Sequence, residues 1–171
     1  MPHEAWGRRA QYWRITIGIL SMSKSQLDLV HCVYCSASTK AALSSTELES
    51  LLEECRQSNS TAGITGILLY QNGSFLQVLE GEQLGVEALF HKIGLDKRHH
   101  HTKKIIFEPI AKRSFAAWTM GFPKITSKEL ATIPGLNDFF HHGTSYVELG
   151  EGRAKSLLAA FKDGKWRASL S

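Results

Sequence analysis

Alternation of apolar and polar residues predicts a β-hairpin in the middle of the chain. The stretch GITGILLYQNGSFLQVLEG, residues 63–81, is rich in Ile, Leu, Val, Phe and Tyr on both sides of Asn72-Gly73. That dipeptide is the strongest short signal for a two-residue turn. A turn there pairs Gln77 with Leu68 on one face of the hairpin. The pattern therefore places a glutamine among large apolar side chains.

The other elements follow from the periodicity of their apolar residues. Residues 27–38, LDLVHCVYCSAS, alternate and predict a strand. Ser44 and Glu47 have the spacing of a capping box, and helical periodicity continues to residue 58. The remaining predictions before Pro123 are a second helix over 85–96, a strand over 103–111 that Pro109 interrupts, and a turn with a short fifth strand over 115–122.

This order, βαββαββ, predicts an α+β ferredoxin-like fold, a mixed sheet with two helices on one face. Residues 28–123 would form this domain. Residues 124–171 predict a helical extension that covers the other face of the sheet or a partner. Its last helix would turn an apolar stripe inward and stop at Gly164. That stripe is Ala154, Leu157, Leu158 and Phe161.

Charge and the N-terminal residues narrow the class of protein. The net charge is +4, of which residues 1–24 hold +3, so no basic face for nucleic acid is expected in the rest. The apolar run in residues 1–27 is too short to span a bilayer. A transit peptide, an amphipathic helix and a start-site artefact all remain open for this extension. We expect a cytoplasmic protein with no membrane association.

Clusters of cysteine and histidine do not predict a metal site. Cys32 and Cys35 lie three apart on a predicted strand, where their side chains point to opposite faces. With Cys55 the chain has three cysteines, and this odd, small number does not suggest a secreted disulfide framework. The segment RHHHTKK, residues 98–104, is interpreted as a solvated loop, because consecutive histidines on a loop cannot all face one ion.

Three polar side chains are expected to converge beneath the helix pair. Tyr34 and Gln77 share the face of the sheet that the helices would cover, and Asn59 ends the first helix. A buried amide without a partner costs roughly 1–3 kcal/mol. A planar polar ligand between the helices would satisfy all three groups. The alternative is a glutamine satisfied by water and a tyrosine whose hydroxyl reaches the surface.

Five motifs in this order resemble the BLUF family, the blue-light sensors that use a flavin. The resemblance covers about residues 28–123 and implies the ferredoxin-like fold, with FAD, or alternatively FMN, between the two helices. The motifs are VYCSAS, SNSTAGITGILLY, GSFLQVLEGE, LFHKIGLDKRHH and FAAWTMGF.

The resemblance also implies roles for individual residues. Tyr34 would donate an electron and a proton to the excited flavin, and Gln77 would bridge that tyrosine and the flavin edge. Asn59 would bond the ring. Trp118 and Met120 would relay the signal, and their equal parity on a regular strand would point both toward one face. The further expected flavin contacts are Leu51, Lys92, Ile93, Asp96, Ser36 and His99.

The chain departs from the family pattern at two positions. Ser58 stands where many members have an asparagine before Asn59, and Lys92 stands where arginine is frequent. Lysine lacks the two parallel donors of the arginine guanidinium. The resemblance implies that both changes would loosen flavin binding or alter selectivity between flavins.

The resemblance implies a non-enzymatic photoreceptor that signals by protein–protein contact. Its downstream protein is unknown, and a homo-oligomer, a dimer or larger, is expected. The main alternative is a light-insensitive or flavin-free interaction module of the same fold. A flavin-dependent enzyme is a third hypothesis, but we find no catalytic acid, base or nucleophile arrangement for it.

Overall fold

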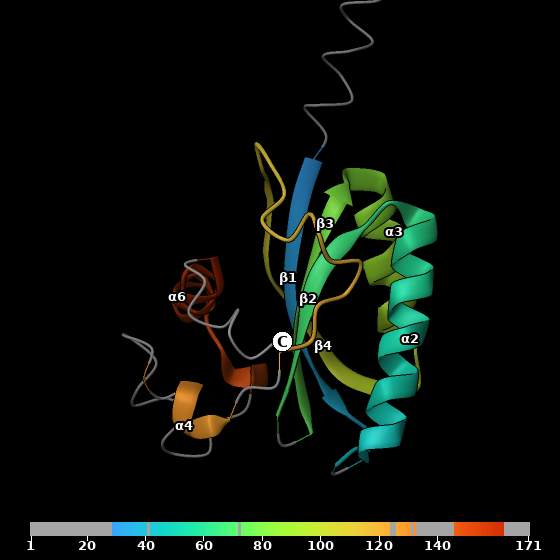
Figure 1. Cartoon of the computed structure of the whole chain (residues 1–171), viewed down its shortest axis with the longest axis vertical. Helices are drawn as coiled ribbons and strands as arrows, with labels where there is room; N and C mark the ends of the chain where they lie inside the picture. The colour runs from blue at the N-terminus through green and yellow to red at the C-terminus, as the bar shows by residue number, and fades with distance from the viewer. Residues whose placement is uncertain are drawn as a thin grey trace, which may run out of the picture.

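The sheet has the strand order of the split βαβ fold. The computed structural model describes residues 29–40, 42–71, 73–123, 126–130, 132 and 146–162. In this part of the chain, four strands pair in the order β2-β3-β1-β4, and every neighbouring pair is antiparallel (Figure 1). The ferredoxin-like α+β fold is thus confirmed. The strands are β1 (Leu29–Ser38), β2 (Thr65–Gln71), β3 (Ser74–Glu82) and β4 (His99–Pro109).

The hairpin of β2 and β3 has the predicted register. Gln77 lies opposite Leu68 on β2 and opposite Tyr34 on β1. Asn72 lies outside the described residues, and Gly73 has a φ of 74°, a left-handed conformation that glycine adopts without strain. Because side chains alternate along a strand, this register fixes which residues of β3 face the helices.

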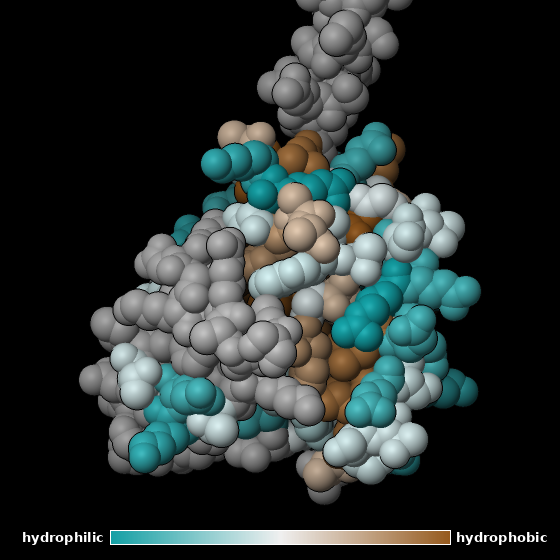
Figure 2. Space-filling model, in the orientation of Figure 1, coloured by the Kyte–Doolittle hydropathy of each residue, from teal (hydrophilic) through white to brown (hydrophobic). Residues whose placement is uncertain are grey.

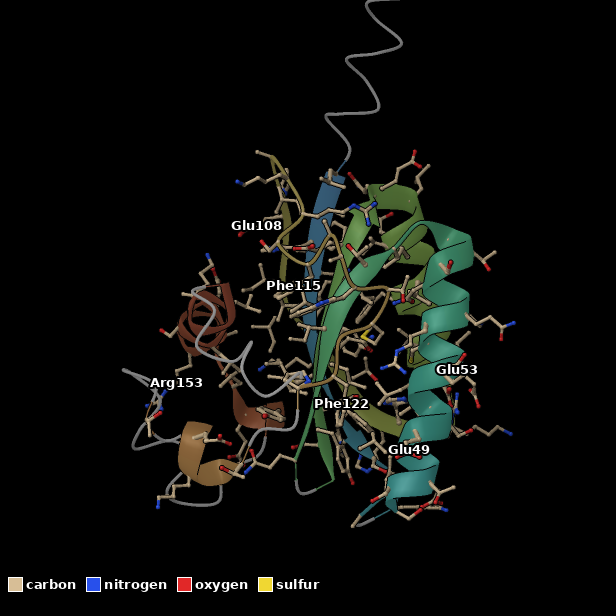
Figure 3. The ribbon with its side chains drawn as sticks, viewed as in Figure 1. Glu49, Glu53, Glu108, Phe115, Phe122 and Arg153 are labelled. Carbon is tan, nitrogen blue, oxygen red and sulfur yellow. The ribbon has the colours of Figure 1, made fainter. Side chains whose placement is uncertain are left out.

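Helices α2 (Ser45–Ala62) and α3 (Gln83–Gly94) cover one face of the sheet (Figure 1). The capping box of Ser44 and Glu47 is present at the start of α2, as predicted. This helix runs four residues beyond the predicted end at 58, and Gly63, in the left-handed conformation, terminates it. Its outer surface is polar, and Glu49 and Glu53 project from it away from the sheet (Figures 2 and 3).

The opposite face of the sheet packs against the C-terminal elements. These are η1 (Tyr146–Glu148) and α6 (Glu151–Lys162). A short helix, α4 (Ser127–Leu130), precedes them in the chain. In α6 the side chains of Ala154, Leu157 and Leu158 are buried on this face, as their spacing predicted. The side chain of Phe161, Gly164 and residues 1–27 lie outside what the structure describes. The sheet therefore separates two hydrophobic cores, one under α2 and α3 and one under α6.

The predicted fifth strand over 115–122 is not a strand. After a turn in which the Trp118 amide bonds the Phe115 carbonyl, the segment touches β2 through a single parallel bridge, Ile67 to Gly121. This bridge is the parallel element of an otherwise antiparallel sheet among the described residues. Because residues 115–118 form this turn, too few residues remain before Gly121 for a regular strand. Three backbone bonds attach the segment to β2: Gly66 N to Trp118 O, Gly121 N to Gly66 O and Leu68 N to Gly121 O.

The histidine-rich segment belongs to β4. His99 pairs with Ser38 and His100 with Ala37, so the interpretation of residues 98–104 as a loop is wrong. His100 and His101 are exposed, as expected of a solvated segment. The pairing of β1 with β4 shifts register twice, and His101 has a φ of 53°. The irregular register hid this part of the strand from a periodicity argument.

None of the described helices is long and apolar enough to cross a membrane.

Candidate functional site

A cavity of about 190 Å³ opens between α2 and α3 over the sheet. Its apolar walls come from both helices and from the sheet: Leu51, Leu89, Ile93, Leu68 and Phe75. Its polar lining comes from the sheet, from both helices and from the segment between α3 and β4. The residues are Tyr34, Gln77, Ser58, Asn59, Lys92, Asp96, Arg98 and His99, with Glu54 and Cys55. Apolar walls with a few convergent polar groups are typical of a site for a planar, partly polar ligand.

Tyr34 and Gln77 meet at the floor of this cavity. They are directly opposite each other on β1 and β3, and the Tyr34 hydroxyl donates a hydrogen bond to Gln77 Oε1. Tyr34 is 1% and Gln77 4% exposed. Burial raises the pKa of Tyr34 well above its usual range, so the phenol is a neutral donor. The ring of Phe90 on α3 packs edge-on against Tyr34, with centroids 5.3 Å apart.

Met120 lies beside Gln77 and Trp118 does not. Gln77 Nε2 donates to Met120 Sδ at 3.5 Å, and Met120 belongs to the core under α2 and α3. Trp118 packs in the other core, where its ring stacks on Phe115 with centroids 5.8 Å apart. The prediction that both point toward one face is therefore wrong. Parity assumes a regular strand, and the backbone turns between Phe115 and Gly121.

Two side chains of helix α2 bond the backbone of residues 118–120, which we call the Met120 segment. Asn59 Nδ2 donates to Thr119 O at 2.6 Å, and Arg56 Nε donates to Met120 O at 3.2 Å. Asn59 is 2% exposed and lines the cavity as well, so one side chain contacts both the cavity and the segment. The role of Arg56 could not be found from the pattern, because its partner is a carbonyl oxygen.

Charged side chains gather at one end of the cavity. Arg98 donates to both carboxylate oxygens of Asp96 and also to Glu54. The hydrogen bonds from Arg98 lower the pKa of Asp96 to about 2. His99 Nδ1 lies 3.0 Å from the hydroxyl of the fully buried Ser36, and burial lowers the pKa of His99.

Most of the predicted site residues meet at the cavity. Eight of them line it: Tyr34, Gln77, Asn59, Leu51, Lys92, Ile93, Asp96 and His99. Ser36 lies behind His99, Met120 lies beside Gln77, and Trp118 is on the far face. Sequence reasoning missed Glu54, Cys55 and Arg98. The first two follow Leu51 at helical spacing on the same face of α2, a signal that would have found them.

The donor set fits an isoalloxazine. Asn59 uses only Nδ2 in its bond to Thr119, so its Oδ1 is available to a ring N–H. Leu51 on α2 and Ile93 on α3 supply an apolar wall from each helix. Burial raises the pKa of the Cys55 thiol to about 11, so this cavity residue is uncharged at neutral pH. Among the described residues, no cluster of His, Cys, Asp or Glu could hold a metal ion.

Fold and site together define a class: a small ferredoxin-like domain with a cavity between two helices and its sheet that suits a planar, partly polar ligand. The profile of one family, BLUF, described as sensors of blue-light using FAD, matches residues 29–121. The chain belongs to the BLUF family.

Relatives and solved structures agree with this assignment. The photoactivated adenylate cyclase subunit beta of Euglena longa is 35% identical over 111 residues, 64% of this chain and 13% of the relative. The chain thus spans about an eighth of that curated relative. The photo-activated state of BlsA superposes with a TM-score of 0.70 at 28% identity, covering 81% of this chain and 97% of that one. The dark-state structure of the BLUF protein BlrB gives 0.65 at 28% identity, covering 81% and 98%.

Proposed function

We propose that this chain is a blue-light flavin sensor and that Tyr34 and Gln77 are its photochemical pair. The hydrogen bond from the Tyr34 hydroxyl to Gln77 Oε1, at the floor of the cavity between α2 and α3, carries the proposal. A bound flavin supplies absorption of blue light and, once excited, the power to oxidise a nearby phenol. An oxidised phenol is strongly acidic, so Tyr34 would pass its proton along the existing bond to Gln77.

Gln77 suits this role because an amide is both donor and acceptor. Its Oε1 accepts from Tyr34 and its Nε2 donates to Met120 Sδ, so both ends of the amide are engaged in the protein. Return of both the electron and the proton to Tyr34, with the amide rotated or tautomerised, would leave a different donor facing the ligand and Met120. No atom is lost, so the altered state would revert thermally.

We propose FAD as the flavin, with FMN as the alternative. Asn59 would bond the polar ring edge, and Leu51 and Ile93 would enclose the ring faces. Lys92 would lie near the O2 atom of the ring and Asp96 near the ribityl and phosphate end. His99 would lie toward the diphosphate, with Ser36 supporting it. Support comes from the family description, which names FAD, and from the apolar walls and polar lining of the cavity, which suit a flavin ring. Chromatography of the cofactor released from purified protein distinguishes FAD from FMN.

Members of this family signal through protein partners, and we propose the same mode of output here. The segment from Trp118 to Met120 would relay the change at Gln77 to the elements on the far face of the sheet. The partner is an unidentified protein, and we propose that the chain itself forms a homo-oligomer, a dimer or larger, without binding nucleic acid or a membrane. Light scattering with and without blue light measures the oligomer.

We also propose that the chain performs no catalysis itself and acts in the cytoplasm. The cyclase relative shares about 111 residues with this chain, a small part of its own length. The three cysteines are unpaired, which suits a reducing compartment. Localisation of a fluorescent fusion in cells tests the second point.

One experiment tests the photochemical proposal. Purified protein should be yellow, and blue light should shift its absorption reversibly to the red. Tyr34→Phe and Gln77→Ala should keep the colour and lose the shift. Tyr146→Phe, a buried tyrosine in the other core, is the matched control and should keep both. A colourless protein would support the flavin-free interaction module, and a yellow protein without a shift would support the light-insensitive one.

A further inference from the structure

Glu80 is a buried acid that contacts the loop before the Met120 segment. It lies on β3 three residues after Gln77 and is 1% exposed. Its Oε1 accepts from the amide of Ser114 and its Oε2 from the amide of Phe115, both at 2.9 Å. A carboxylate that accepts backbone N–H bonds on both oxygens holds these amides in one orientation.

Arg113 fastens the same loop from the other side. Its guanidinium donates to Thr65 Oγ1 at 3.0 Å, to the Glu80 carbonyl at 2.9 Å and to the Gly63 carbonyl at 2.7 Å. Residues 113–115 are thereby tied to β3 and to the start of β2. Arg113 bonds the main-chain carbonyl of Glu80 and not its carboxylate. The two side chains therefore hold the loop through separate hydrogen bonds.

The fixed loop determines where the following residues go. Phe115 is 5% exposed in the core under α6 (Figure 3). Trp118 stacks on it. From there the chain has few residues in which to reach Gly121, which is bonded to Gly66 on β2. With both ends held, Met120 is directed through to the other face of the sheet, against Gln77.

From these contacts we propose that Glu80 is a positioning residue of the light response: its carboxylate sets the turn at Ser114 and Phe115, and this turn places Met120 at Gln77. The proposal rests on the proposed role of Gln77 and Met120. Glu80 itself touches neither the cavity nor Gln77, so its action runs through the backbone of residues 114–120.

A second acid on the same face provides a matched control. Glu80 is opposite His31 on β1, and His31 is opposite Glu108 on β4. His31 Nε2 lies 3.1 Å from Glu108 Oε1, and Lys155 of α6 lies 3.9 Å from the other oxygen of this acid. Glu108 thus belongs to the same polar row, but its bonds go to side chains and not to the Met120 segment.

The test follows the methyl group of Met120 in the flavin-loaded full chain. The chain has three methionines, so methyl-labelled protein gives few resonances, and Met120→Leu assigns the relevant one. Glu80→Gln puts an amide NH2 against one of the two backbone donors. We expect it to shift or split the dark-state Met120 resonance and to change its response to blue light, with the flavin still bound. Arg113→Ala should act in the same direction.

Two controls separate positioning from loss of stability. Glu108→Gln alters the same face and Leu158→Ala weakens the core under α6, and neither should move the dark-state Met120 resonance. If Glu80→Gln does not fold, the half-exposed Arg113→Ala carries the test. An unchanged Met120 resonance in the folded variants, in darkness and in light, overturns the positioning role. Absence of a red shift in the unmodified protein instead overturns the photochemical proposal, and the dark-state comparison still decides the role of Glu80.

Discussion

Trp118 and Met120 are two residues apart and pack into different cores, one on each face of the sheet. Met120 accepts a hydrogen bond from Gln77 under the helices, whereas Trp118 stacks on Phe115 under α6. To bring Trp118 to Gln77, the backbone between them must rotate and Met120 must leave. The connection between the two faces of the sheet is thus a short turn.

Met120→Ala should separate photochemistry from its relay. The Tyr34–Gln77 bond does not involve Met120, so the flavin and the red shift should be retained. Loss of a buried methionine side chain should lower the free energy of unfolding by about 2–5 kcal/mol. Hydrogen exchange in darkness and light should show that α6 no longer responds. Met120→Leu, which conserves volume, is the stability control, and a light response of α6 in Met120→Ala would contradict the relay role.

Lys92→Arg should tighten flavin binding. Lys92 lines the cavity, and arginine would offer two parallel donors where lysine offers a single point charge. We expect a gain in flavin affinity of roughly 3- to 10-fold, in line with the net value of one additional hydrogen bond. Fluorescence titration of the apoprotein measures it. Lys97→Arg, outside the cavity, should leave the affinity unchanged, and an equal gain in both variants would assign the effect to surface charge.

His99 should make the protein less stable in mild acid. Burial lowers its pKa in the folded state, so the unfolded chain binds the proton more readily. Stability from the neutral ring is present above the unfolded pKa of about 6.5 and is lost as the pH falls through the folded pKa. His99→Gln should flatten this part of a denaturation series between pH 7 and 4. The exposed His91→Gln should not, and a parallel slope in both variants would exclude His99 as the cause.

Gly66→Ala should disrupt the hairpin and the attachment of the Met120 segment together. A Cβ at Gly66 would overlap the carbonyl oxygen of Val78 on β3. The same glycine bonds Trp118 and Gly121 through its amide and its carbonyl. We expect a loss of stability above about 2 kcal/mol in urea denaturation, a size typical of overpacking within a sheet. Gly94→Ala, with open space around the added methyl, should be tolerated, and equal stability of the two variants would refute the steric account.

Most of the sheet and most of the cavity lining could be predicted from the sequence. The dipeptide at 72–73 set the register of β2 and β3, and alternation then placed Gln77 and Tyr34 on the helix-covered face. These predictions succeed because each depends on local rules: a turn type, a two-residue period and a helix cap. The cavity residues of α2 follow the same helical period from Leu51 to Asn59.

The parts that failed depend on contacts distant in sequence. Nothing near Trp118 indicates that a carboxylate on β3 bonds the turn before it and ends strand character there. The start of β4 at His99 was missed because its pairing with β1 is irregular. Asn59 was assigned to a ligand, and its bond to Thr119 was not foreseen, because a carbonyl partner leaves no mark on residue type.

The segment carrying Met120 is joined to β2 by three backbone hydrogen bonds. At about 0.5–1.5 kcal/mol each, these bonds and the two from Asn59 and Arg56 place a detached form several kcal/mol above the attached one. A form of that energy is populated at a small but finite level before any photon arrives. Illumination would then need only to change the ratio of two arrangements that already interconvert. The population of the detached arrangement in darkness would depend on the hydrogen bonds to the edge of β2 as much as on the chromophore.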